Sequence, residues 1–210
     1  MAPPSFKLCY ISDRLALRPT PLLGFIRKAI QAGVDLIQIR EKDLGTRPLA
    51  ELVKAGVESS RGAGTRVLVN DRLDVALAVG AAGVHLGTQS VPARAVRKRV
   101  PEGFLVGISC HSVEDAIEAE SAGADYVLLG PVFATPSKLH YGAPLGLEKL
   151  KQAAGRANVP VLALGGITVE HVKPCLEAGA AGIAGISIFQ TCDSLDERVR
   201  ELRTRFDDRT

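Results

Sequence analysis

The sequence has no tryptophan and few aromatic side chains of any kind. Aromatic residues make up 4% of the 210 residues, and the formal net charge is only +3. Proteins that bind nucleic acid usually carry blocks of basic residues, and those that bind single strands also stack aromatic side chains on the bases. The chain has neither feature, so a nucleic-acid partner is not expected.

Long apolar runs are also missing. No apolar stretch approaches the roughly 20 residues needed to span a bilayer. The first five residues, MAPPS, have neither the charged start nor the apolar core of a signal peptide. We therefore expect no membrane partner and a cytoplasmic location.

The four cysteines form no recognisable metal or disulfide motif. Cys9, Cys110, Cys175 and Cys192 are far apart, and there is no CxxC pair and no cluster with histidine. Three of them lie in or near apolar strand or helix patterns, where a buried, reduced thiol is the usual state. The thiols are expected to be free, as in a reducing cytoplasm.

The composition is that of a globular protein, with 46% apolar and 23% charged residues. A chain of this length builds one well-buried core and is short for two complete domains. No linker or low-complexity segment interrupts it. We therefore expect a single domain over residues 1–210.

Apolar runs typical of strands alternate with amphipathic segments typical of helices. The expected strands are 8–12, 35–40, 66–70, 83–87, 104–109, 126–130, 159–164 and 182–188. The expected helices are about 19–32, 48–61, 74–79, 92–99, 116–122, 145–154, 169–177 and 195–206. Ser112 begins a sequence typical of a helix N-cap.

Eight strand–helix units predict a (β/α)8 TIM barrel, with a doubly wound open sheet as the alternative. The strands are nearly continuous apolar runs, as expected for parallel strands covered on both faces. Three of the turns that lead into strands share a pattern, at residues 31–35, 121–125 and 177–181.

The most unusual polar stretch is Gln38-Ile39-Arg40-Glu41-Lys42, at the end of the second strand. Side chains alternate along a strand, which places Gln38, Arg40 and Lys42 on one side and Ile39 and Glu41 on the other. Two cations and an amide on one side suit an anionic ligand. A solvated edge strand with ordinary surface charges is the alternative.

Other polar residues follow further strands, and in such a barrel the active site lies at these carboxyl ends. They are Asn70 and Asp71 after the third strand, Ser109 and His111 after the fifth, Thr135, Ser137 and Lys138 after the sixth, Gly165 and Gly166 after the seventh, and Ser187 at the end of the eighth.

This set suggests phosphate binding. Gly165 and Gly166 expose backbone N–H groups before a helix, where anions are favoured. Lys138, with Thr135 and Ser137, could close over a second anion. The alternatives are a plain tight turn at the glycines and an ordinary surface turn at 135–138.

Asp71 is a candidate Mg²⁺ ligand, because Mg²⁺ bound with phosphates needs only one or two carboxylates. A helix N-cap is the alternative for this residue. Among the histidines, His111 is the candidate for acid–base chemistry. His85 is expected to be packed and hydrogen-bonded, and His140 and His171 to lie on a loop and a helix surface.

Eight short motifs resemble the thiamine phosphate synthase and TenI (thiazole tautomerase) family, over essentially the whole length. They are Gln38–Lys42, Val69–Asp71, Gly83–Gly87, Gly107–His111, Gly123–Tyr126, Gly130–Phe133 with Thr135–Lys138, Gly165–Ile167 and Gly185–Ser187. The resemblance implies that a thiazole phosphate nitrogen displaces pyrophosphate from hydroxymethylpyrimidine pyrophosphate with the assistance of Mg²⁺.

The resemblance also implies roles for individual residues. Asp71 would hold Mg²⁺ and Ser109 would contact the pyrimidine substrate. The pyrimidine pyrophosphate would be bound by Gln38, Arg40, Lys42, Asn70 and Lys138, and the thiazole phosphate by Thr135, Ser137, Gly166, Ile186 and Ser187, with Gly165 beside them.

One position departs from the synthase pattern. Ser90 stands where the synthases carry a second Mg²⁺-binding aspartate, and a hydroxyl is a poorer Mg²⁺ ligand. This change resembles the TenI branch, where the resemblance implies a metal-free proton shift that uses a histidine at position 111. Synthase is the leading hypothesis. The tautomerase and a non-catalytic regulator that binds phosphate ligands are the alternatives, and a homo-oligomer is possible for any of them.

Overall fold

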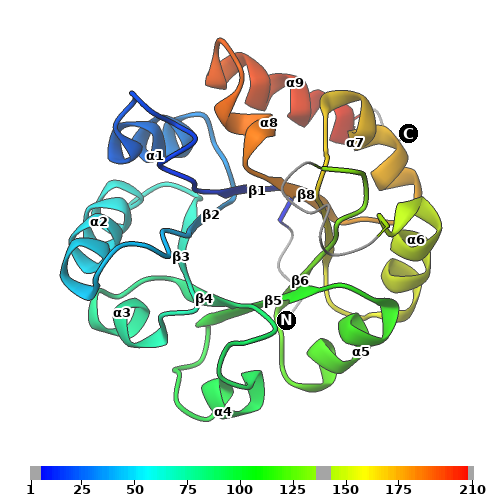
Figure 1. Ribbon diagram of the computed structural model, residues 1–210, viewed down its shortest axis with the longest axis horizontal. Coiled ribbons are helices and arrows are strands. Elements are labelled where there is room, and N and C mark those ends of the chain that lie inside the picture. Colours follow the sequence, from blue (N-terminus) through cyan, green and yellow to red (C-terminus); the bar gives the residue numbers. More distant parts are fainter. Residues whose placement is uncertain (1–5, 136–142, 208–210) are drawn as a thin grey trace.

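The protein is a closed barrel of parallel strands surrounded by helices. The computed structural model describes residues 6–135 and 143–207. In this part of the chain eight strands pair in sequence order, and β8 pairs back onto β1. Figure 1 looks down the barrel and shows the helices as an outer ring. The predicted TIM barrel is confirmed, and the open sheet is excluded. The strands are β1 (Leu8–Ile11), β2 (Leu36–Ile39), β3 (Arg66–Asn70), β4 (Gly83–Leu86), β5 (Leu105–Cys110), β6 (Tyr126–Leu129), β7 (Val161–Leu164) and β8 (Gly182–Gly185).

The helices begin and end close to the predicted positions. Ser112 is the N-cap of α5, and its Oγ accepts a hydrogen bond from the Asp115 N–H at 3.0 Å. The first helix begins only after Pro21, whose backbone is extended. The helices are α1 (Leu22–Gln31), α2 (Thr46–Ser59), α3 (Leu73–Ala78), α4 (Ala93–Arg97), α5 (Val113–Ser121), α6 (Gly146–Arg156), α7 (Val169–Glu177), α8 (Ser187–Gln190) and α9 (Leu195–Asp207).

The predicted end of the eighth strand is wrong. Strand β8 ends at Gly185, and the short helix α8 occupies Ser187–Gln190. The backbone of Ile186 already has helical dihedral angles, φ −103° and ψ −69°. A helix of four residues is too short to show the 3.6-residue period that distinguishes helix from strand in a sequence.

The turns before β2, β4, β6 and β8 have one common structure. In each, a glycine with positive φ ends the preceding helix, three residues before the strand begins; these are Gly33, Gly80, Gly123 and Gly179. The residue after each glycine donates its N–H to a carbonyl five residues back, as Val34 does to Ala29 and Ala124 does to Ala119. This is the bonding of a helix C-cap in which glycine adopts the left-handed conformation. Three of these turns share a sequence pattern, and the turn at Gly80 is the fourth with the same structure.

Two apolar cores lie on the two sides of the strands. The larger packs the strands against the helices. The smaller fills the inside of the barrel with residues from the strands and Phe6. Along several strands the inward positions change from apolar to polar toward the carboxyl end, as from Leu36 to Gln38 and from Leu105 to Ser109. The inside of the barrel is therefore filled with apolar side chains toward the amino ends of the strands and lined with polar side chains at their carboxyl ends.

At the opposite end of the barrel, two aspartates hold neighbouring strands together. Asp35 accepts hydrogen bonds from the N–H groups of Lys7 and Leu8, at 2.9 and 2.8 Å, and pairs with Arg203 of α9 at 2.7 Å. Asp125 accepts the N–H of Val106 at 2.6 Å and pairs with Arg97 of α4 at 2.5 Å. Each carboxylate thus joins the start of one strand to the strand before it and to a helix.

The cysteines are free thiols, as predicted: Cys9, Cys110 and Cys175 are buried, and Cys192 is partly exposed. Within residues 6–135 and 143–207, no helix is both long enough and apolar enough to cross a membrane.

Candidate active site

A cavity of about 690 Å³ opens at the carboxyl ends of the strands. Most of the predicted site residues line it, and they come from strands all around the barrel. Among the residues that line it are Gln38, Arg40, Lys42, Asn70, Asp71, Ser109, His111, Thr135, Gly165, Gly166, Ile186 and Ser187. The structure therefore brings together residues that are far apart in the sequence.

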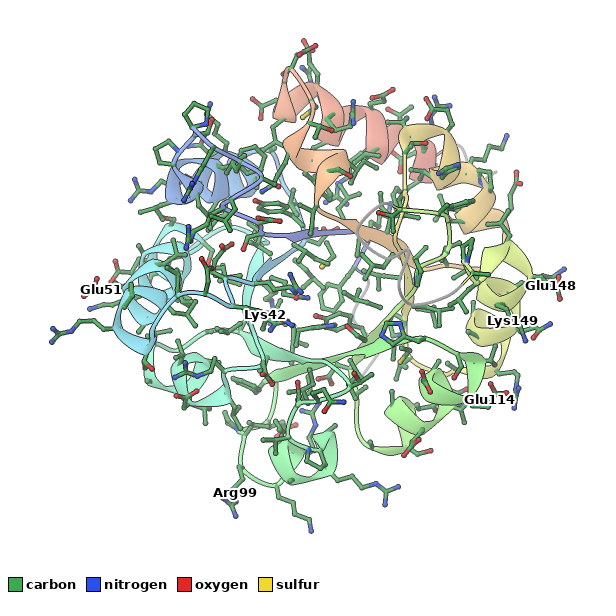
Figure 2. All side chains as sticks on the ribbon, viewed as in Figure 1. Lys42, Glu51, Arg99, Glu114, Glu148 and Lys149 are labelled. Carbon is green, nitrogen blue, oxygen red and sulfur yellow. The ribbon has the colours of Figure 1, made fainter. Side chains whose placement is uncertain are left out.

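The polar stretch Gln38–Lys42, at the end of β2, alternates as predicted. Gln38, Arg40 and Lys42 line the cavity, whereas Ile39 and Glu41 do not. Figure 2 shows Lys42 on the inner side of the ring, while the labelled side chains Glu51, Arg99, Glu114, Glu148 and Lys149 lie on the outside. A closed barrel leaves this strand between two neighbours, and Gln38 is only 2% exposed, so the edge-strand alternative is wrong.

Glu41, which faces away from the cavity, holds the backbone of this stretch in place. Its carboxylate accepts the Ser12 hydroxyl at 2.5 Å and the Arg14 N–H at 3.2 Å, and Ser12 Oγ in turn accepts the Arg40 N–H at 2.9 Å. Burial raises the pKa of Glu41, while the bonds from Ser12 and Arg14 act against that rise. These contacts anchor the backbone that carries Arg40 and Lys42.

Gln38 has an unused hydrogen-bond donor. Its amide nitrogen is buried and has no hydrogen-bond partner within the described part of the chain. A buried donor without a partner costs free energy, and such groups in native structures usually serve a ligand or a water molecule. Because Gln38 lines the cavity, a bound ligand with an acceptor atom at this position would satisfy it.

Asn70 and Asp71 follow β3 and line both this cavity and a smaller one of about 270 Å³ beside it. Asp71 has a positive φ of 65°, and its N–H donates to the His85 carbonyl at 2.8 Å. Helix α3 has Arg72 as its N-cap, so the alternative of Asp71 as the cap residue is not borne out. A residue with a side chain in this conformation is uncommon and often marks a functional position.

Ser109 on β5 faces the cavity and is bonded from below by His85. The distance from Ser109 Oγ to His85 Nε2 is 2.9 Å, and His85 Nδ1 lies 3.1 Å from the Tyr126 hydroxyl. His85 is 1% exposed, as expected for a packed histidine. Burial, together with the nearby charge of Arg40, lowers the pKa of His85 to about 3, so the ring is neutral at physiological pH.

His111, the predicted acid–base residue, lines the same cavity. Its ring Nδ1 lies 2.6 Å from the Gly130 carbonyl oxygen, and its backbone N–H donates to the Asp115 carboxylate at 2.7 Å. Because a carbonyl can only accept, Nδ1 carries the proton in this contact. Backbone and ring are both held in place.

The turns after β6 and β7 pack closely against each other. Gly165 and Gly166 have positive φ values of 94° and 64°. A Cβ on Gly165 would lie 2.7 Å from Pro131, and one on Gly166 would lie 2.5 Å from the Ala134 carbonyl oxygen. Only glycine fits both the backbone and the space. Ser137 and Lys138 lie outside the described residues, as does His140.

His171 lies on α7 and is partly exposed, as predicted, but it also makes contacts that the prediction did not include. Its ring stacks on Phe133 with centroids 3.7 Å apart, and its Nδ1 lies 2.9 Å from the Gly166 carbonyl oxygen. His171 therefore supports the glycine turn from outside the cavity. Asp13, Thr88 and Gln89 also line the cavity and were not predicted. The signal for Asp13 is its place two residues after the end of β1, at a carboxyl strand end.

Ser90 is at the cavity wall, where its Oγ accepts the Gly87 N–H at 2.8 Å. Within residues 6–135 and 143–207, no three His, Cys, Asp or Glu side chains are grouped so that they could hold a metal ion. The donor set at the cavity instead suits a cation that takes most of its oxygen ligands from a substrate, because Asp71 is present and Mg²⁺ commonly binds in this way.

Comparisons with known proteins agree with this geometry. A family described as "Thiamine monophosphate synthase" matches residues 8–189. A "Putative thiamine-phosphate synthase" from Geobacter sulfurreducens is 42% identical over 210 residues, covering 100% of this chain and 99% of the relative. A "Putative thiamine-phosphate synthase 2" from Aquifex aeolicus is 47% identical over 167 residues, covering 80% and 89%. A solved structure of a thiamine phosphate pyrophosphorylase from Pyrococcus furiosus superposes with a TM-score of 0.87 at 35% identity, covering 97% and 96%. The chain belongs to the thiamine monophosphate synthase family.

Proposed function

We propose that the protein is a thiamine-phosphate synthase, which joins hydroxymethylpyrimidine pyrophosphate and thiazole phosphate into thiamine phosphate and releases pyrophosphate. One observation carries the proposal: a single cavity has cations from β2 on one wall and the glycine turn with the start of α8 on another. Such a cavity suits two phosphorylated substrates side by side. The names of the curated relatives support the same activity.

On this proposal the cationic wall binds the pyrimidine pyrophosphate. Arg40 and Lys42 neutralise the pyrophosphate as it leaves, and Gln38 and Asn70 supply hydrogen bonds. A departing group that gains negative charge is stabilised most by cations already in position. Lys138, from the loop after β6, is proposed to join this group.

The opposite wall is proposed to hold the thiazole phosphate and to aim its ring nitrogen at the pyrimidine. Ser109 contacts the pyrimidine. The residues proposed for the thiazole phosphate are Thr135, Ser137, Gly165, Gly166, Ile186 and Ser187. Holding two reactants in one orientation removes much of the entropic cost of their reaction.

Mg²⁺ fits as a cation shared with the substrate, and Asp71 would hold it from the protein side. When bound, it would neutralise charge on the pyrophosphate. Ser90 adds a hydroxyl in place of a second carboxylate, so this chain leaves more of the charge to Arg40 and Lys42.

A second candidate function is isomerisation of a thiazole carboxylate phosphate. The observation in its favour is that His111 lines the cavity with a fixed ring. The resemblance adds that Ser90 stands where the synthases carry a carboxylate. A proton shift needs a positioned acid–base group and no leaving pyrophosphate.

The test is to incubate the purified protein with both synthase substrates and Mg²⁺ and to measure thiamine phosphate by chromatography. Lys42→Ala is expected to lower kcat/KM by about 100-fold, because a cation that stabilises developing charge commonly contributes this much. Lys149→Ala is the matched control, since Lys149 lies on the outer side of the ring (Figure 2), and it is expected to leave the rate unchanged.

Two results would contradict the synthase. Isomerisation of the thiazole without thiamine phosphate formation, lost in His111→Ala, would favour the tautomerase. Binding of the phosphate ligands without either reaction would favour a regulator.

A further inference from the structure

Three strands place Tyr126, His85 and Ser109 in one line from the core to the cavity. Gly107 of β5 is paired with His85 of β4 on one side and with Tyr126 of β6 on the other. A Cβ on Gly107 would collide with the Tyr126 ring and would lie 2.6 Å from His85 Nδ1. The glycine therefore allows the two rings to meet across it. Ser109 lies two residues further along β5, on the same face.

The bottom of this line is apolar. Tyr126 is 0% exposed and belongs to the core inside the barrel, where it packs edge-on against Phe6 with ring centroids 5.9 Å apart. Burial raises the pKa of its hydroxyl well above the usual value, so the phenol keeps its proton. Among the described residues, the partner of this hydroxyl is His85 Nδ1.

The Tyr126 proton sets the direction of every hydrogen bond above it. A neutral imidazole has one N–H and one acceptor nitrogen, and among the described residues each nitrogen of His85 has one hydroxyl within reach. If Nδ1 carried the hydrogen, the phenol proton would be buried without an acceptor, which is costly. If Nδ1 accepts from Tyr126, the phenol and both nitrogens of His85 are satisfied, and His85 Nε2–H donates to Ser109.

We propose that Tyr126 and His85 are positioning residues that commit the Ser109 hydroxyl to donate its hydrogen into the cavity, so that the site selects a ligand with an acceptor atom there. Because Nε2–H already occupies an acceptor position on Ser109 Oγ, the hydroxyl hydrogen points to the ligand. An unprotonated ring nitrogen of a pyrimidine is such an acceptor. The identity of this ligand rests on the proposed function, whereas the direction of the bonds does not.

The direction is measured without any substrate. The ¹⁵N shifts of a histidine ring distinguish the two neutral tautomers, and the His85 signals are assigned by their loss in His85→Gln. We expect the Nε2–H tautomer in the wild-type protein at neutral pH. The Nδ1–H tautomer, or a mixture of the two, would overturn the proposal even if thiamine phosphate is formed.

The consequence for recognition is measured by the affinity for hydroxymethylpyrimidine pyrophosphate alone, by calorimetry. Ser109→Ala is expected to weaken binding at least tenfold, and Tyr126→Phe by three- to tenfold, because the latter frees His85 to change tautomer. Tyr10→Phe is the matched control: Tyr10 is also 0% exposed, and its hydroxyl bonds to Gln190 instead of to the cavity residues.

Equal affinity losses in Tyr126→Phe and Tyr10→Phe would show a general packing effect and would overturn the role in recognition. A variant that fails to fold leaves the tautomer measurement on the wild-type protein to decide. If the wild type has the Nε2–H tautomer but binds no pyrimidine pyrophosphate, the proposed function fails and the hydrogen-bond direction stands.

Discussion

At the scale of single residues, Ser90 bears most directly on the proposed Mg²⁺ site. Its hydroxyl faces the cavity wall and accepts the Gly87 N–H. A carboxylate at the same place could keep that bond with one oxygen and offer the second to Mg²⁺. Serine at this position therefore keeps the bond to the Gly87 N–H but offers no negative charge to a cation.

We predict that Ser90→Asp tightens Mg²⁺ binding in the presence of pyrophosphate by about tenfold or more, since hard cations prefer charged oxygen ligands. Calorimetric titration with Mg²⁺ measures the change directly, and the Mg²⁺ concentration for half-maximal rate should fall with it. Ser90→Asn has a similar shape without the charge and serves as the control. Equal Mg²⁺ affinity in all three proteins would show that no cation is held between positions 71 and 90.

For the stretch at the end of β2, the strand period alone was enough to predict which side chains face the cavity. Gln38, Arg40 and Lys42 alternate with Ile39 and Glu41, and one face had to be the inside. The stack of His171 on Phe133 joins residues of two different units, and no local pattern carries that information. The contact of His85 with Tyr126 likewise depends on how three strands are paired.

Among the elements, α5 shows how a helix start positions a site residue. Ser112 accepts the Asp115 N–H, and the Asp115 carboxylate accepts the N–H of His111 at 2.7 Å. Asp115 therefore connects the two residues: its N–H bonds to the cap Ser112, and its carboxylate bonds to His111. The order of the helix start and the position of His111 are coupled.

We expect Ser112→Ala to lower the free energy of unfolding by about 1 kcal/mol, the usual contribution of a serine N-cap. Ser112→Asp keeps a side-chain acceptor and should stay within about 0.5 kcal/mol of the wild type, because aspartate caps as well as serine does. Urea unfolding followed by circular dichroism gives both values. Equal losses in the two variants would mean that the cap bond does not stabilise α5.

The order of the elements was predictable because each strand and most helices are long enough to show their period. Their ends were less so. The sequence predicts a strand that continues to Ile188, because Ile186 and Ile188 extend its apolar run, whereas β8 ends at Gly185 and α8 follows. The conformation that separates them is fixed by packing in the barrel, which the local sequence does not encode.

For the whole molecule, the two aspartates at the end of the barrel where the strands begin connect neighbouring strands and helices. Asp35 contacts the start of β1 and Arg203 of α9, so it links the first and last parts of the described chain. Its side chain is 23% exposed, and two backbone N–H groups depend on it. Asp125 joins β5 and β6 in a similar way, through the Val106 N–H and Arg97 of α4.

We predict that Asp35→Ala lowers the free energy of unfolding by about 2–4 kcal/mol, since it leaves two backbone donors and a partly buried arginine without their partner. The control is Asp207→Ala: its ion pair with Lys7 is exposed, at 76% for the aspartate, and should contribute less than about 1 kcal/mol. Chemical denaturation measures both. A similar small loss in both variants would show that Asp35 has no special part in closing the barrel.

The four matching turns before β2, β4, β6 and β8 give the molecule a hidden fourfold symmetry. By placing each of these strands at the same height, they bring Gln38, His85, Leu128 and Ala184 to equivalent places inside the barrel, each two residues after the first residue of its strand. Two of the four are polar and two are apolar, and the polar pair belongs to β2 and β4 while the apolar pair belongs to β6 and β8. The turns therefore repeat four times around the barrel, but the layer of side chains inside it is polar at β2 and β4 and apolar at β6 and β8. This asymmetry gives two different substrates two different surroundings.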